Sequence, residues 1–223
     1  MSVVIVTGGF GALGRAVVAG LTQRGFTVAA VDVAPAPAGF PAALALGGVD
    51  LTDEKAVSAA YASVAEKLGA LNGLVNIAGG FVWEPVEGGT LANWDKMYQM
   101  NLRTAATSSA AALPHLLRQG GAIVNVGAAA AAQPDVGMAP YTASKAGVRA
   151  LTESLAEEMR GKKVRVNAIL PTIIDTPANH AAMPDADSSA WVRPEAAAKV
   201  IAFLLSDESA AITGASLPLS LAG

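Results

Sequence analysis

Short apolar runs alternate with longer amphipathic stretches along the whole chain. The runs show no period-two alternation, which is typical of strands buried on both faces of a parallel sheet; they cover residues 3–6, 27–31, 73–75, 122–126 and 164–170. The stretches between them have helical patterns, over residues 14–24, 53–68, 91–117, 141–160 and 194–205. This alternation predicts an α/β fold, a single-domain, Rossmann-like doubly wound parallel sheet with helices on both faces. No linker or internal repeat is present, so residues 1–223 are expected to form one domain.

Composition narrows the classes of partner. Hydrophobic residues make up 52% and charged residues 15% of the chain, which favours a compact globule. A net charge of −3 without a basic run predicts no nucleic-acid partner, and the lack of cysteine with only two histidines predicts no metal site. No apolar run approaches the ~20 residues that span a bilayer. The N-terminal residues lack the features of a signal peptide, so we expect a cytoplasmic protein that binds no membrane.

A glycine-rich turn follows the first strand and opens the first helix. Its glycines and small alanine would let the backbone approach a pyrophosphate, and the helix N-terminus would offer free N–H groups to it. Such a turn alone is weak evidence, but here a strand precedes it and an amphipathic helix follows. The turn residues expected to bind a dinucleotide are Gly8, Phe10, Gly11, Ala12, Leu13 and Gly14.

Two aspartates extend this cofactor prediction. Asp32 ends the second strand, where a carboxylate accepts hydrogen bonds from ribose hydroxyls and repels a 2′-phosphate. No Lys or Arg stands at 9–11 or directly after Asp32, which favours NAD(H) over NADP(H); the alternative is an ordinary strand-end aspartate that caps a loop. Asp50 has two interpretations, the N-cap of the following helix or a contact to adenine from the loop after the third strand.

Five motifs stand in order along the chain. They are Thr7-Gly8 with Ala12-x-Gly14, Asn76-Ile-Ala-Gly79, Asn101, Tyr141-x-x-x-Lys145, and Pro171-x-x-x-x-Thr176. Together they resemble the short-chain dehydrogenase/reductase family over nearly the whole chain. The last residues, Ile212-Thr-Gly214 followed by a short apolar run, are similar to that family's final strand.

The resemblance implies hydride transfer between a nicotinamide and a substrate, with Tyr141 as acid/base. Tyr141 and Lys145 at i,i+4 share a helix face, so the ammonium would bring the phenol pKa from ~10 toward neutrality. Lys145 would also bond the nicotinamide ribose, and Asn101 would kink its helix and hold a water linking Lys145 to solvent. Without the cofactor motifs, the tyrosine and lysine would be interpreted as ordinary surface residues of an exposed helix.

The resemblance implies further cofactor contacts beyond the first turn. They come from the end of the fourth strand and from the segment after the sixth, and comprise Asn76, Ala78, Gly79, Pro171, Ile173 and Thr176. The Ile173 backbone and the Thr176 hydroxyl would lie near the carboxamide.

One family position departs from the pattern. Ala128 stands thirteen residues before Tyr141, where the family normally carries a serine that bonds the substrate carbonyl. Three explanations stay open: the substrate does not need that bond, another group supplies it, or the enzyme is degenerate.

Beyond the shared motifs, the chain resembles the quinonoid dihydropteridine reductase branch, which also has Ala at this position and prefers NADH. The likeness lies in Gly8–Gly14, in residues 29–33 and 78–81, in Gly137-Met138, and above all in a substrate lid at about 176–194. A quinonoid pterin is reduced across a conjugated C=N system, for which a carbonyl-polarising serine is dispensable. The resemblance therefore implies reduction of a small planar conjugated substrate.

Candidate substrate contacts are Phe81, Trp83, Ala128 and Met138. For the two rings, stacking on a flat substrate competes with an ordinary core role, and His180 in the lid is interpreted as a solvated loop residue rather than a catalyst. The rival functions are a generic ketone/alcohol or imine oxidoreductase and a non-catalytic dinucleotide-binding sensor. The helices at 91–117 and 141–160 would pair in a homodimer or homotetramer, as is common in the family.

Overall fold

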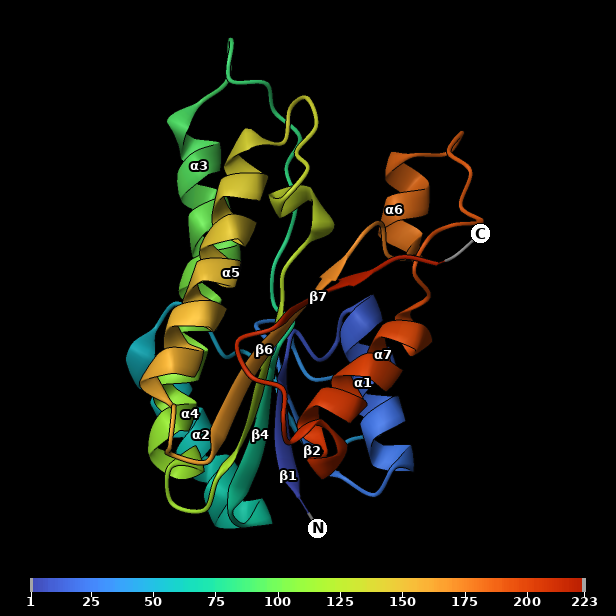
Figure 1. Ribbon diagram of the computed structural model, residues 1–223. Helices are drawn as coiled ribbons and strands as arrows, with labels where there is room; N and C mark the ends of the chain where they lie inside the picture. Colours follow the sequence, from blue (N-terminus) through green and yellow to red (C-terminus); the bar gives the residue numbers. More distant parts are fainter. Residues whose placement is uncertain (1, 222–223) are drawn as a thin grey trace.

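Seven parallel strands form one sheet in the computed structural model, which describes residues 2–221 (Figure 1). Residues 1 and 222–223 of the expected domain lie outside the described residues. The strands are β1 Val3–Thr7, β2 Thr27–Val31, β3 Leu44–Leu46, β4 Leu71–Asn76, β5 Gly121–Val126, β6 Val164–Pro171 and β7 Ser216–Leu219, in the order β3-β2-β1-β4-β5-β6-β7. The order reverses between β1 and β4, which confirms a doubly wound sheet and opens a crevice at the carboxyl ends of these strands.

Helices cover both faces of the sheet, as expected. They are α1 Ala12–Gln23, α2 Glu54–Leu68, α3 Leu91–Met97, α4 Thr104–Leu116, α5 Ala139–Glu158, α6 Pro177–Ala182 and α7 Pro194–Leu205, with the shorter turns η1 Tyr98–Arg103, η2 Ala129–Ala131 and η3 Asp207–Ser209. Figure 1 shows α1 and α7 on one face and α2, α4 and α5 on the other. Each face buries its own apolar cluster, one centred on Val17 and Ile201 and the other on Tyr61 and Leu155.

The helix predicted over residues 91–117 is present, but it is not α-helical throughout. The structure breaks it into α3, a π-helical turn η1, and α4. Asn101 lies in η1 with 1% of its surface exposed. The irregularity that we expected at Asn101 is therefore a π-helical turn. In a π-helical turn the backbone hydrogen bonds join residues five apart instead of four apart. Such turns are often found at functional sites.

Two further differences concern strands. β3 was not among the predicted runs, because it has only three residues and all of them are half-buried at the edge of the sheet. β4 begins at Leu71, two residues before the predicted start, since Asn72 fits the strand by accepting a hydrogen bond from the Val3 amide at 3.0 Å.

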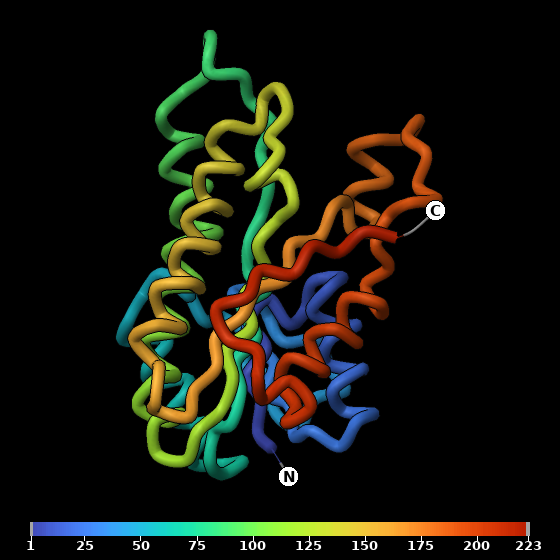
Figure 2. Tube along the Cα trace, in the orientation of Figure 1, coloured from blue at the N-terminus to red at the C-terminus, as the bar shows by residue number. Residues whose placement is uncertain are grey.

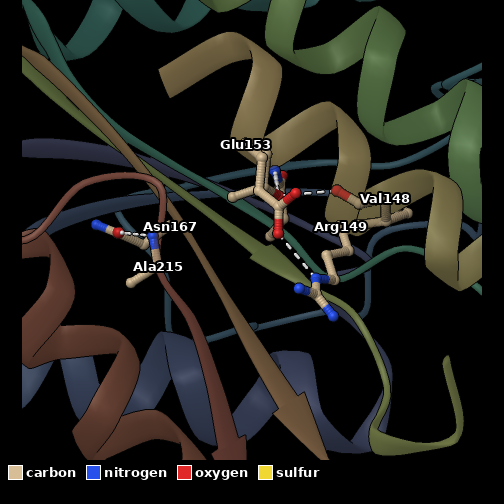
Figure 3. A network of polar contacts seen from close by, with 7 residues as sticks. Val148, Arg149, Glu153, Asn167 and Ala215 are labelled. Atoms are coloured by element: carbon tan, nitrogen blue, oxygen red, sulfur yellow. Dashed lines mark hydrogen bonds and ion pairs between the residues drawn. The ribbon is translucent and has the colours of Figure 1, made fainter. Parts of the chain in front are cut away.

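The last strand is held to the sheet through a buried amide. Asn167 of β6 donates to the Ile212 carbonyl at 2.9 Å and accepts from the Ala215 amide at 3.0 Å, and Figure 3 shows the second of these bonds. These bonds seat β7 beside β6, as the sequence predicted for the tail. Figure 3 also shows α5 with its exposed Arg149–Glu153 ion pair. Within residues 2–221, no helix combines the length and apolar character needed to cross a membrane.

Candidate active site

The glycine-rich turn packs closely against the residues that follow β4, which leaves no room for a side chain at Gly8. Gly8 adopts φ +63°, and a Cβ there would come within 2.8 Å of the Ala78 nitrogen. A Cβ on Gly14 would overlap the Gly8 carbonyl oxygen. The Thr7 hydroxyl joins the two strand ends by accepting from the Ile77 amide at 3.1 Å. The result is a bare-backbone cradle at the N-terminus of α1, which fits a pyrophosphate.

Asp32 is aligned by the same turn. Its carboxylate accepts from the Phe10 amide at 3.0 Å and from the Ala34 amide at 3.0 Å. The side chain is therefore fixed beside the cradle, directly after β2, where it would receive ribose hydroxyls.

Asp50 is not the cap of α2. That position belongs to Asp53, whose side chain accepts from the Lys55 and Ala56 amides. Asp50 instead accepts from the Thr52 amide at 2.8 Å and its hydroxyl at 2.7 Å, and these bonds lower the pKa of the Asp50 carboxyl. Of the two interpretations, only the adenine contact stays a prediction.

Two residues that contact Phe10 of the glycine-rich turn were not predicted from the sequence. Phe40 packs edge-on against Phe10 with ring centroids 4.9 Å apart. The Arg15 guanidinium lies 5.3 Å from the centre of the Phe40 ring, and its Nε donates to the Phe10 carbonyl at 2.8 Å. Phe40 belongs to a loop rich in proline and alanine without helix or strand periodicity, so no pattern marked it.

Tyr141 and Lys145 lie on the first turns of α5, beyond the end of β5. Lys145 is buried, with 5% of its surface exposed, and its Nζ donates to the Val126 carbonyl at 2.8 Å. Tyr141 is half-buried. Its ring packs against the Phe81 ring in a T-shaped arrangement, with ring centroids 5.0 Å apart and an interplanar angle of 87°. The pair is thus built into the carboxyl edge of the sheet rather than displayed on an exposed helix.

The structure does not show the expected lowering of the Tyr141 pKa. Burial raises the pKa of the Tyr141 phenol to about 12 and lowers the pKa of the Lys145 ammonium to about 8. Both shifts have one cause, since removing solvent disfavours whichever form is charged. The phenol is therefore the protonated, proton-donating form at neutral pH.

Asn101 is locked between three elements. Its amide donates to the Gly80 carbonyl at 3.1 Å and to the Ser144 hydroxyl at 3.0 Å, and its oxygen accepts from the Gly80 amide at 3.0 Å. Ser144 in turn donates to the Tyr141 carbonyl at 2.7 Å, so it is engaged along α5 and does not replace the missing serine. A Cβ on Gly79 would lie 2.5 Å from the Asn101 oxygen, which explains the glycine.

The Asn76 side chain is engaged inside the molecule. Its amide donates to the Asn125 oxygen at 2.8 Å and to the Ser109 hydroxyl at 3.1 Å, both buried. The side chain therefore ties β4 to β5 and α4 inside the molecule, and a cofactor contact from this residue is left to its backbone.

The substrate side is apolar and open. Ala128 is buried after β5, with 4% of its surface exposed, and is followed by the alanines of η2. Phe81 and Trp83 have exposed fractions of 50% and 59%, which rules out the core role for both rings. Met138 is half-buried at the start of α5.

The lid segment leaves the end of β6 at Pro171. The Ile173 carbonyl accepts from the Val192 amide at 2.8 Å, closing the base of the segment. The Thr176 hydroxyl caps α6 by accepting from the Asn179 amide at 3.3 Å. His180 is half-exposed and bonds Asp175 at 2.7 Å between Nε2 and Oδ1.

Comparisons with known proteins agree with this geometry. The family model described as short chain dehydrogenase matches residues 2–187. The 3-oxoacyl-[acyl-carrier-protein] reductase FabG of Thermotoga maritima is 30% identical over 95% of this chain and 93% of its own. Ligand-free aldohexose dehydrogenase of Thermoplasma acidophilum superposes with a TM-score of 0.90 at 27% identity, covering 98% of this chain and 92% of that one. Carveol dehydrogenase of Mycobacterium avium, solved in complex with NAD, gives 0.86 at 26% identity over 98% and 95%.

This chain therefore belongs to the short-chain dehydrogenase family, and it is an oxidoreductase. The dihydropteridine reductase branch is not among these relatives, which are reductases and dehydrogenases of other substrates. Among residues 2–221, no group of three or more His, Cys, Asp or Glu side chains could hold a metal ion.

Proposed function

We propose that this chain reduces a small, planar, conjugated substrate with NADH, and that a quinonoid dihydropteridine is the first candidate. The observation that carries the proposal is the buried Ala128, two residues after the Val126 carbonyl that accepts from Lys145 Nζ. A methyl group stands where the family carries a donor to the substrate carbonyl. Loss of such a donor costs about 2.7–4 kcal/mol of transition-state stabilisation, so a substrate that spreads charge over a conjugated system suffers least from it.

The cofactor end of the proposal depends on three features. The bare cradle of Gly8 and Gly14 suits the pyrophosphate, and the aligned Asp32 suits the ribose hydroxyls. No Lys or Arg stands at 9–11 or directly after Asp32 to receive a 2′-phosphate, and Arg15 of α1 donates its Nε to the Phe10 carbonyl. These features favour NAD(H) over NADP(H); the bound nicotinamide would supply the hydride.

Tyr141 would deliver the proton. Its pKa of about 12 keeps the phenol protonated at neutral pH, which suits an acid in the direction of reduction. Lys145, one helical turn away with a pKa of about 8, can change charge near neutral pH and so exchange the proton onward. Asn101 holds the Gly80 backbone and α5 together at this point.

The alternative is a generic ketone/alcohol or imine oxidoreductase that works without the serine. The printed names of the relatives, a 3-oxoacyl reductase and dehydrogenases of aldohexose and carveol, favour it. For that activity the missing donor would have to come from the substrate itself.

The experiment is NADH oxidation with quinonoid dihydropterin generated in situ, beside a panel of small ketones, aldehydes and imines, each repeated with NADPH. Rapid pterin-dependent oxidation that prefers NADH is the expected result. Activity on ketones or aldehydes alone would replace the proposal by the alternative. NADH binding without turnover of any substrate would contradict both.

Self-association is part of the proposal. Leu91, Trp94 and Tyr98 on α3 and η1 and Leu117 after α4 are exposed apolar side chains, and Leu91 is 79% exposed. Burying them against a second copy would remove this surface from water. We expect a homodimer or homotetramer by light scattering coupled to gel filtration; a monomer at micromolar concentration would contradict it.

A further inference from the structure

Two segments on the substrate side run next to each other in opposite directions. Phe81 meets the Tyr141 ring edge-on at 5.0 Å, and three residues further the Glu84 amide donates to the Gly137 carbonyl at 2.8 Å. Figure 1 shows the region that contains both segments rising beyond the carboxyl edge of the sheet, and Figure 2 traces the same chain path. Residues 81–84 thus flank the stretch that leads into α5.

Trp83 is the main link between the segments. Its indole Nε1 donates to the Val136 carbonyl at 2.9 Å. Its ring lies against Gly137, where a Cβ would overlap it, and Gly137 has φ +73°. Because Trp83 is 59% exposed, core burial does not hold the ring, and its position depends on these two contacts.

The start of α5 needs such an external support. The helix begins at Ala139, directly after Gly137-Met138, and no side chain caps its first turn. Pro140 favours the helix start through its fixed φ, but without a side-chain cap the start also depends on its neighbours. Tyr141 lies on this first turn, so a shift of residues 136–138 moves the phenol with it.

The geometry points to Trp83 as a positioning residue, which fixes the start of α5 through Val136 and Gly137 and so places the Tyr141 phenol. This inference rests on the proposed acid/base role of Tyr141. The indole N–H is used within the chain, while stacking of the exposed ring face on a substrate stays a prediction.

Three variants and one matched control test the inference. Trp83→Ala removes both the ring and the donor, Trp83→Phe keeps a ring but not the donor, and Gly137→Ala pushes the ring away. Gly137→Ala also introduces backbone strain, since its φ is +73°. Gly88→Ala is the control for that strain: Gly88 has φ +75°, lies in the loop that follows Trp83, and has nothing within 4 Å of its Cβ position.

Activity gives the first measurement. For the substrate that the wild-type enzyme turns over, we expect kcat to fall about ten- to a hundredfold in Trp83→Ala and Gly137→Ala, as misplacement of a reacting group does. The Kd for NADH, measured by its fluorescence, stays unchanged. Trp83→Phe retains an intermediate rate, and Gly88→Ala keeps the wild-type rate.

The ionisation of Tyr141 gives a second measurement that needs no substrate. The absorbance of ionised phenol, corrected with Tyr141→Phe, follows this residue alone. A loosened helix start exposes the phenol, so its pKa should fall toward ~10 in Trp83→Ala and Gly137→Ala but not in Gly88→Ala. A shifted titration in a protein without activity on any substrate would sink the proposed function and leave this inference standing.

Other results overturn the inference. Wild-type kcat and wild-type Tyr141 titration in Trp83→Ala would show that the ring positions nothing. A rise in KM alone, with an unchanged titration, would make Trp83 a substrate contact. An equal loss in Gly88→Ala and Gly137→Ala would assign the effect to backbone strain. If Gly137→Ala does not fold, the two Trp83 variants decide.

Discussion

The two halves of the candidate site are built in different ways. On the cofactor side, Gly8 and Gly14 leave no room for a Cβ, and Phe10 beside them is 8% exposed. On the substrate side, Phe81 and Trp83 are about half exposed and are held by a few contacts to the start of α5 and the loop before it. Backbone fit thus defines the cofactor half, and side chains define the substrate half. A site made of side chains on loops changes readily, which agrees with the varied substrates named for the relatives.

The largest effect should come from the group that joins the two halves. Tyr141→Phe removes the phenolic proton while keeping the ring that packs on Phe81. We expect kcat to fall about 10²–10⁴-fold, the usual contribution of a positioned acid, with the Kd for NADH unchanged. Persistent turnover would show that another group donates the proton.

The next effect concerns the cofactor half alone. Asp32→Asn keeps an acceptor for the Phe10 amide but removes the charge that would face a 2′-phosphate. Because like-charge contact costs several kcal/mol, the ratio of NADPH to NADH affinity should rise about tenfold or more. Fluorescence titration of both cofactors measures this ratio. Asp95→Asn on exposed α3 is the control, and an equal change there would refute the assignment.

A smaller and selective effect is expected on the substrate half. Ala128→Ser restores a hydroxyl at the buried position after β5. It should raise kcat/KM for simple ketones about tenfold or more and change that for quinonoid dihydropterin much less. The two substrates are compared on the same protein preparation. A uniform gain on both would mean that the conjugated substrate also needs the missing donor.

The smallest effect is a pH dependence of stability. The folded pKa of Lys145, about 8, lies below its ordinary value of 10.5, so the fold disfavours the protonated form. This penalty is complete below pH 8 and disappears as pH rises toward 10.5, so this residue makes stability rise with pH over that window. Lys145→Met should lack that rise by thermal denaturation at pH 7–10. Parallel curves for both proteins would contradict the burial of a titrating lysine.

Much of the cofactor half followed from residue order, because backbone-limited motifs have local signatures. The glycines at 8 and 14, the aspartate after β2 and the i,i+4 spacing of Tyr141 and Lys145 all lie in the expected elements. The contacts of Phe40 with Phe10 and Arg15 were not predicted, because a loop side chain meets its partner only after the chain has folded. Asp50 was ambiguous because capping motifs overlap, and Asp53 took the cap.

The sequence by itself determined the doubly wound sheet and the family and indicated the proposed catalytic pair, because hydrophobic period and short motifs are local properties of the chain. The tertiary structure alone decided the π-helical turn around Asn101, the direction of the Tyr141 pKa shift and the contact of Trp83 with Gly137. Each of these depends on burial or on contact between residues far apart in the chain, and burial exists only once the sheet and its helices have closed around them.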